Sequence, residues 1–211
     1  WEGPTGQAAL APAYVVATDV LEQWNALWVR ARDLAWMLER DVLGTLARTA
    51  GLLPERHAAS ARARLEAWKL AAVLENIGRM EVRGRDSLGI SVLISLPDAA
   101  AFEGLLEGLR ARGLEGDLRG RLALRDLPDG GVRLDDRSPR PSLLFAFKVS
   151  QEVGALGDNV NHLRARLRAD ELFWEACTAE ASSSTAWSHT RWASNGIISE
   201  ANCHPVDDET L

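Results

Sequence analysis

The sequence predicts an α+β fold in which a helical segment comes first and strands alternate with helices after it. Apolar residues recur three and four apart over residues 19–49 and again over 58–79, as on one face of a helix. Residues 89–96 form a short β-branched run and residues 142–149 a short apolar one, as expected of strands. Mixed strands and helices after a helical start indicate layered α+β packing.

The first 80 residues are predicted to form two amphipathic helices. The apolar positions of the first helix are Leu21, Trp24, Trp28, Ala31, Ala35, Leu38 and Val42, and those of the second are Leu65, Trp68, Ala72, Val73 and Ile77. Gly51 and Pro54 interrupt the pattern, and such a short connection predicts a helical hairpin. We interpret Trp24, Trp28, Trp36 and Trp68 as core filling between the two helices.

Strand and helix signals alternate in the rest of the chain. The expected elements are a strand at 89–96, a helix at 99–112, a β-hairpin from 121–127 through a turn at 128–131, a strand at 142–149, a helix at 158–179 and a polar loop at 182–185. The hairpin prediction depends on the Pro-Asp-Gly-Gly sequence of the turn, whose glycines adopt positive φ readily.

Composition excludes several classes of function. The 211 residues carry a formal charge of −6 from interleaved acidic and basic residues, so no basic patch for nucleic acid is expected. No run of eighteen apolar residues and no signal-peptide pattern occurs, which predicts a cytoplasmic protein without a membrane segment. Cys177 and Cys203 fit neither a disulfide framework nor a zinc pattern, and we expect no metal or cofactor. We expect each cysteine to be a buried small residue or a loop residue.

The strongest chemical signal lies near the end of the chain. Residues 188–196 read Ser-His-Thr-Arg-Trp-Ala-Ser-Asn-Gly, and residues 199–205 read Ser-Glu-Ala-Asn-Cys-His-Pro. A fixed cation beside a Trp, followed by small polar residues and a glycine, suits a small anionic ligand. Arg191 could hold a carboxylate through two parallel hydrogen bonds. The alternative is a structural arginine that stacks on Trp192 at the end of a strand.

These residues resemble the His-Thr-Arg-Trp-Ala-Thr-His-Gly and Ser-Glu-Ala-Asn-Ala-His-Pro signature of class II glutamine amidotransferases. The likeness is to glutamine–fructose-6-phosphate aminotransferases, which make glucosamine 6-phosphate. A second block at 79–90, Arg-Met-Glu-Val-Arg-Gly-Arg-Asp-Ser-Leu-Gly-Ile, is similar to the family's Arg-Leu-Glu-Tyr-Arg-Gly-Tyr-Asp-Ser-Ala-Gly-Ile. A weaker third block extends from Phe147 to Leu156. The resemblance therefore predicts a partial amidotransferase domain at 74–211 and a helical hairpin insertion at 1–73.

The resemblance implies a fold, a reaction and a set of site residues. The fold is the N-terminal nucleophile hydrolase arrangement, in which two sheets lie between helical layers (αββα). The reaction is hydrolysis of glutamine through a thioester on an N-terminal cysteine, which supplies ammonia for amino sugar metabolism. Arg191 would hold the glutamine carboxylate, Trp192 would shape the closing loop and Ser194 would replace the family's Thr. Arg83 would lie near the nucleophile, whereas His204 matches a family histidine of unassigned role.

The sequence also departs from the family pattern. Asn195 stands where the sugar enzymes have His, and Arg85 where they have Tyr. The chain begins with Trp1, so we expect the nucleophilic cysteine upstream of it, and the Asn-Gly of the oxyanion hole downstream of Leu211. Cys177 and Cys203 lack a free α-amine and cannot replace that nucleophile. On this interpretation the chain is an inactive fragment.

Two hypotheses of different class follow. In the first, the parent is an enzyme with glutamine as substrate and a sugar-phosphate isomerase domain downstream. Its oligomeric state is left open, and a homo-oligomer is one of the alternatives. In the second, the chain is a non-catalytic module that senses glutamine or binds a partner through its Trp-rich helices. The codons upstream of Trp1 distinguish them, because Met-Cys-Gly there favours the enzyme.

Overall fold

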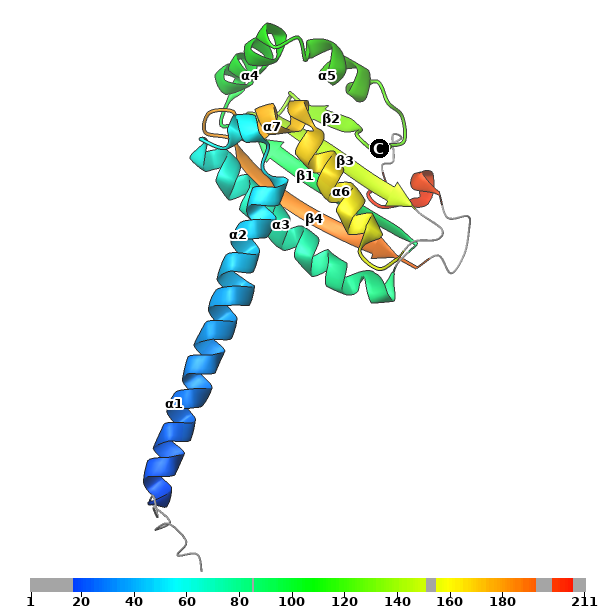
Figure 1. The fold of residues 1–211 in the computed structure, drawn as a ribbon. Coiled ribbons are helices and arrows are strands. Elements are labelled where there is room, and N and C mark those ends of the chain that lie inside the picture. Colours follow the sequence, from blue (N-terminus) through cyan, green and yellow to red (C-terminus); the bar gives the residue numbers. More distant parts are fainter. Residues whose placement is uncertain (1–16, 85, 151–154, 193–198, 207–211) are drawn as a thin grey trace, which may run out of the picture. The chain divides into compact units, whose positions relative to one another are not determined.

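The computed structural model describes residues 17–84, 86–150, 155–192 and 199–206, and the chain divides into two units, Trp1–Gly44 and Thr45–Leu211 (Figure 1). In the first unit, helix α1 (Thr18–Met37) runs into a π-helix, η1 (Leu38–Leu43). Helix α2 (Gly44–Leu52) begins at the boundary between the units. The long helix predicted over 19–49 is therefore confirmed, with a π-helical segment inside it. In the described residues, no helix has both the length and the apolar character needed to span a membrane.

The second unit is built on a four-stranded antiparallel sheet in the order β2-β3-β1-β4 (Figure 1). The strands are β1 (Ser87–Ser95), β2 (Val132–Asp135), β3 (Ser142–Ser150) and β4 (Ser183–Arg191). The two predicted strands, 89–96 and 142–149, are confirmed as β1 and β3. They are the central pair of the sheet, with Ile90 opposite Phe147 and Val92 opposite Phe145.

The hydrophobic core lies on one face of this sheet. Alternate residues of β1 and β3 point to that face, and Ile90, Val92, Phe145 and Phe147 are fully buried there. Helices α3 (Ala61–Met80), α6 (Asp158–Ala169) and α7 (Glu171–Thr178) pack in the same core. The Phe173 ring of α7 meets the rings of Phe145 and Phe147 edge-on, at centroid distances of 5.4 and 5.5 Å.

Helix α3 belongs to the second unit, so the boundary at Gly44 lies before the predicted one at residue 73. The reason is its apolar face, where Ala67, Leu70 and Leu74 are buried in the core. The Ser60 hydroxyl accepts a hydrogen bond from the Ala63 N–H at 3.2 Å and caps this helix.

The tryptophans of the helical segment do not fill a core, contrary to the sequence-based interpretation. Their exposed fractions are 68% for Trp24, 77% for Trp28, 59% for Trp36 and 50% for Trp68. The core is instead closed by α3, α6 and α7. Apolar spacing alone cannot distinguish a face that packs inside the chain from one that is left for a partner.

Three further predictions need correction. Residues 115–122 form a helix, α5 (Glu115–Leu122), so the β-hairpin joins β2 to β3 and does not begin at 121. The helix expected over 158–179 breaks at Asp170, whose carboxylate accepts a hydrogen bond from the Phe173 N–H at 2.9 Å and starts α7. The polar segment 182–185 is largely strand, because β4 pairs with β1 along its full length. Helix α4 (Ala99–Ala111), capped by Asp98, confirms the helix predicted there.

Candidate functional site

The two sequence motifs meet at one end of the sheet. Strands β1 and β4 are antiparallel, with Ser87 opposite Arg191 and Gly89 opposite His189. The start of β1 and the end of β4 therefore lie at the same end of the sheet, although about a hundred residues separate them in the sequence. Side chains alternate along a strand, so Arg191 and His189 belong to the face opposite the helical core.

The segment that carries Arg83 is held against Arg191 by its backbone. Arg83 ends a short 3-10 helix, η3 (Glu81–Arg83), and is exposed. Gly84 follows, and a Cβ there would lie 2.9 Å from the Thr190 hydroxyl oxygen and 3.1 Å from the Arg191 backbone. The Asp86 N–H donates a hydrogen bond to the Arg191 carbonyl at 3.2 Å. A glycine suits this position because a Cβ would crowd the Thr190 hydroxyl and the Arg191 backbone.

Arg191 also contacts the second part of the late motif. Its Nη1 donates a hydrogen bond at 2.7 Å to the carbonyl of Asn202, the last residue of a short 3-10 helix, η4 (Glu200–Asn202). This bond orients the guanidinium, whose five N–H donors suit a carboxylate. Trp192 follows and is 62% exposed. Ser194 and Asn195, which the sequence also assigned to the site, lie outside the described residues.

The loop after η4 lies on the open face of the sheet, over β1. A Cβ on Gly89 would overlap the carbonyl oxygen of His204, so this glycine permits the loop to approach the strand. The imidazole rings of His204 and His189 are 4.4 Å apart between centroids. Partial burial, followed by the charges of His204 and Arg191, lowers the pKa of His189. Arg83, Arg191 and His204 are therefore gathered at one end of the sheet.

Two hollows differ in their suitability for an anion. A cleft of about 340 Å³ beside the loop is bordered by Gly89, Trp187, His189 and His204. A larger one of about 610 Å³, between α4 and the end of α7, contains Asp98, Glu175 and Glu180 and no basic residue among those that line it. Repulsion by these carboxylates disfavours a carboxylate ligand in the larger hollow.

Neither cysteine of the chain suits nucleophilic attack. Both are buried, which is one of the two alternatives that the sequence left open for each, and burial raises the pKa of each thiol, that of Cys177 most strongly. The Cys203 sulfur lies 3.4 Å from the Leu88 carbonyl oxygen, between β1 and the loop. A thiol of this kind packs as a small apolar residue.

Sequence reasoning missed a polar network that fixes the loop. The Asp129 carboxylate accepts hydrogen bonds from the Lys148 N–H and from Nε of Arg166, both at 2.9 Å. Its own N–H donates to the Glu200 carboxylate at 2.5 Å. Lys148 is 2% exposed, its ammonium has no hydrogen-bond partner within the described residues, and burial lowers its pKa. A Lys inside an apolar strand was the one available signal, since such burial is rare.

Comparison of the chain with protein-family models, with curated proteins and with solved structures found no match.

Proposed function

We propose that the second unit is the glutamine-recognition part of a class II glutamine amidotransferase domain, of the kind that supplies ammonia for glucosamine 6-phosphate synthesis. The observation that carries the proposal is the pairing of Ser87 with Arg191, which brings the two motif blocks to one edge of the sheet. Two short motifs so far apart in the sequence would meet in this way if they formed one site.

The layering of the second unit supports the same proposal. Helices cover one face of the sheet, whereas the other face carries partly or largely exposed residues such as Leu93, Leu144 and Trp187. In an αββα arrangement of the N-terminal nucleophile hydrolase type, a second sheet would pack on that face. One helical layer and one sheet are half of such a structure.

The proposed chemistry is recognition by fixed cations. The Arg191 guanidinium, oriented by Asn202, would bind the α-carboxylate of glutamine through charge-assisted hydrogen bonds. Arg83, held beside it through Gly84, would add positive potential where the side-chain amide reacts. The attacking thiolate would come from the N-terminal cysteine of the parent enzyme, since Cys177 and Cys203 are buried.

Calorimetric titration of the 211-residue chain with L-glutamine tests the proposal. We expect binding of L-glutamine, weaker binding of D-glutamine and no release of ammonia. Arg191→Lys should weaken binding by roughly ten- to more than hundredfold, whereas Arg137→Lys, at an exposed position between β2 and β3, should retain it. Equal binding by the two variants would contradict the proposed site, and ammonia release abolished by substitution of Cys177 or Cys203 would contradict the assigned nucleophile.

The same titration addresses the non-catalytic alternative, in which the pocket only senses glutamine. Both hypotheses predict binding by this chain, so the parent gene must decide between them. Met-Cys-Gly upstream of Trp1 would support the enzyme, and another start in an intact reading frame would support the sensor.

A further inference from the structure

We infer that α1 is a self-association helix that pairs with α1 of a second copy of this chain, antiparallel, through a seam in which each Trp lies opposite an Ala. The α1 seam is defined by Leu21, Trp24, Trp28, Ala31, Ala35 and Leu38. These positions alternate three and four apart, which is the spacing of a two-stranded coiled coil.

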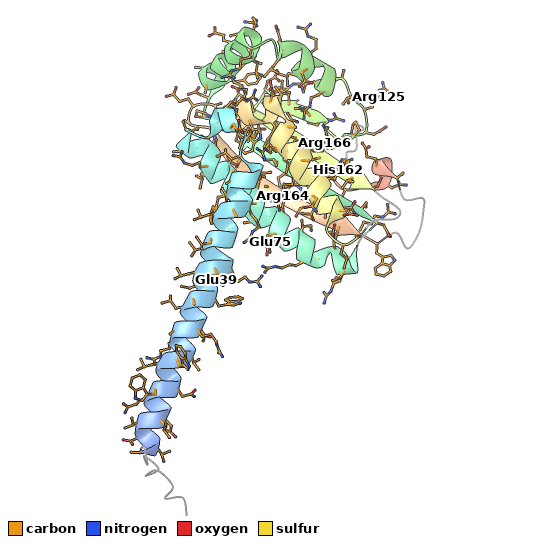
Figure 2. All side chains as sticks on the ribbon, in the orientation of Figure 1. Glu39, Glu75, Arg125, His162, Arg164 and Arg166 are labelled. Carbon is orange, nitrogen blue, oxygen red and sulfur yellow. The ribbon has the colours of Figure 1, made fainter. Side chains whose placement is uncertain are left out.

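Exposure indicates that the α1 seam needs a partner. Trp24, Trp28 and Leu38 are 68%, 77% and 47% exposed, and no residue of α1 is buried. Side chains project into the solvent along the helix, up to and past Glu39 (Figure 2). Large apolar side chains in such number are rare on a monomer surface and mark an interaction site.

The order of large and small residues selects the orientation. Read forwards, the α1 seam is Leu-Trp-Trp-Ala-Ala-Leu, and read backwards it is Leu-Ala-Ala-Trp-Trp-Leu. Two antiparallel copies therefore place Trp24 opposite Ala35, Trp28 opposite Ala31 and Leu21 opposite Leu38. Each internal layer then combines one large and one small side chain, which fills the space evenly.

A parallel pair would pack poorly. Trp24 would face Trp24 of the partner subunit and Trp28 would face Trp28 of the partner subunit, and two Ala layers would follow. Two crowded layers beside two empty ones would cause both strain and cavities. Leu27 and Leu34 flank the α1 seam on one side and would meet each other across the antiparallel axis.

The π-helix fixes where the α1 seam ends. Residues 38–43 have more residues per turn than an α-helix, so Val42 rotates away from the line of the seam. The antiparallel register that uses residues 21–38 includes only Leu38, the first residue of the π-helix, whereas a register shifted by one heptad would need Val42. The local geometry therefore favours the Trp–Ala register.

Charge and area agree with a second copy as the occupant. Residues 18–43 carry five acidic and three basic side chains, unlike the cationic helices that lie on anionic membranes. In the antiparallel pair, Trp24 and Trp28 of both chains provide four Trp side chains, which together bury on the order of 600–1,000 Å². With the leucines added, the interface reaches about the lower size of stable complexes, so a weak and reversible dimer is expected.

Sedimentation velocity of the full chain from about 1 to 200 μM tests the inference. We expect a monomer–dimer equilibrium. Trp24→Ala and Ala35→Trp should each weaken dimerisation by roughly thirtyfold or more, since each damages two layers. The double variant with both substitutions again places one large and one small side chain in each of the same layers. Its dimer affinity should return to within about threefold of that of the unchanged chain. Trp36→Ala, at another exposed Trp that lies off the α1 seam, should leave the affinity unchanged.

A double variant with Asn25→Cys and Arg32→Cys tests the orientation, because these positions flank the α1 seam and meet each other only in the antiparallel pair. We expect disulfides between position 25 of one chain and position 32 of the other, identified by mass spectrometry. A monomer at 200 μM, a combined variant no better than the single ones, disulfides between like positions, or binding of the monomer to phosphatidylcholine–phosphatidylserine vesicles without dimerisation would overturn the inference.

Discussion

At the scale of single residues, the candidate site depends on two glycines whose lack of a side chain permits close backbone contacts. Gly84 permits contact with the Arg191 backbone, and Gly89 permits contact with the His204 carbonyl. These approaches, together with the buried Cys203, hold the motif segments against the sheet. Substitution of either glycine should therefore displace the loop and the arginine together.

Gly89→Ala is expected to destabilise the second unit by about 2–4 kcal/mol, because the new Cβ would overlap the His204 carbonyl and the loop must move. Urea unfolding followed by circular dichroism measures this change. Gly104→Ala, in the middle of α4 with no atom within 4 Å of the new Cβ, serves as the control and should stabilise by about 0.5–1 kcal/mol. Equal effects of the two substitutions would show that the loop does not contact Gly89.

The buried His57 should make stability depend on pH. Burial lowers its pKa, and the Arg56 Nε donates a hydrogen bond to Nε2 at 3.1 Å, as suits a neutral ring. The Glu175 carboxylate, which also pairs with Arg112, opposes the shift without cancelling it. Since the pKa is lower in the folded state, the unfolded state binds the proton first. The stabilisation is present above pH 6.5 and is lost as the pH falls through the folded-state pKa.

We therefore expect the urea midpoint to decrease between pH 7 and pH 5, and His57→Gln, which keeps an acceptor but does not titrate in this range, to reduce that decrease. His189, whose pKa is also lowered, should account for a further part. An unchanged pH dependence in His57→Gln would show that His57 titrates alike in the folded and unfolded states.

The sequence allowed part of the site to be predicted at this scale. The Arg83 and Arg191 blocks were found because their residue types and order form recognisable strings, and burial was one of the two alternatives that residue type offered for each cysteine. Asp129 and Lys148 lie in segments that the sequence singled out, but their roles were not predicted, because an Asp in a turn and a Lys in a strand acquire these roles only when β3, the turn and the η4 loop come together.

At the scale of elements, the least predictable strand is β4. Its residues Ser183–Arg191 are mostly small and polar, and only pairing with the strongly apolar β1 makes them a strand. By contrast, β1, β3 and α4 were predictable because apolar runs and a capping Asp are local signals. The α6–α7 break was missed because Asp170 acts as a cap inside a continuous helical pattern.

Helix α3 is joined to β4 by a buried polar cluster. Glu66, 2% exposed, accepts hydrogen bonds from the Ser184 hydroxyl at 2.7 and 2.6 Å and pairs with the Lys69 ammonium at 2.7 Å. Lys69 also donates to Ser184. Because β4 offers few apolar side chains to α3, this cluster should contribute strongly to their packing.

Glu66→Ala is expected to lower the free energy of unfolding by about 2–4 kcal/mol, since it leaves Lys69 and Ser184 without their carboxylate. The control is Glu75→Ala on the same helix (Figure 2), where the carboxylate pairs with Arg48 and Arg79 but is a third exposed. That change should cost less than about 1 kcal/mol. A smaller effect at Glu66 than at Glu75 would contradict the role of the cluster.

At the scale of the whole molecule, the two units should be separable. Among the residues that the structure describes, the buried hydrophobic core lies between Leu52 and Cys177, and none of it belongs to the first unit. A chain that starts at Thr45 should therefore unfold cooperatively with a free energy within about 0.5 kcal/mol of the full chain. It should also be monomeric, since α1 is gone. Loss of cooperative unfolding in the shortened chain would show that the second unit depends on the first.

The decisive test of the proposed function belongs to a complete enzyme, in which the synthase half can use ammonia from either source. Arg191→Lys keeps the charge but replaces a planar fork of donors by a flexible point charge, so one charge-assisted hydrogen bond to the glutamine carboxylate should be lost. Such a loss costs about 1.5–3 kcal/mol, which corresponds to a decrease in kcat/KM for glutamine of roughly ten- to more than hundredfold.

The ammonia-dependent rate of the same Arg191→Lys protein needs no glutamine carboxylate and should be preserved, provided that the synthase accepts free ammonia. Both rates are measured on one preparation, with circular dichroism to establish that the fold is intact. Arg191 also bonds to the Asn202 carbonyl, and a lysine that merely released this loop would lower stability, which the same spectra and a urea midpoint would reveal. A selective loss of glutamine use with unchanged stability can then arise only from ligand recognition. Equal loss of both rates, or loss of neither, would show that Arg191 does not bind the glutamine carboxylate.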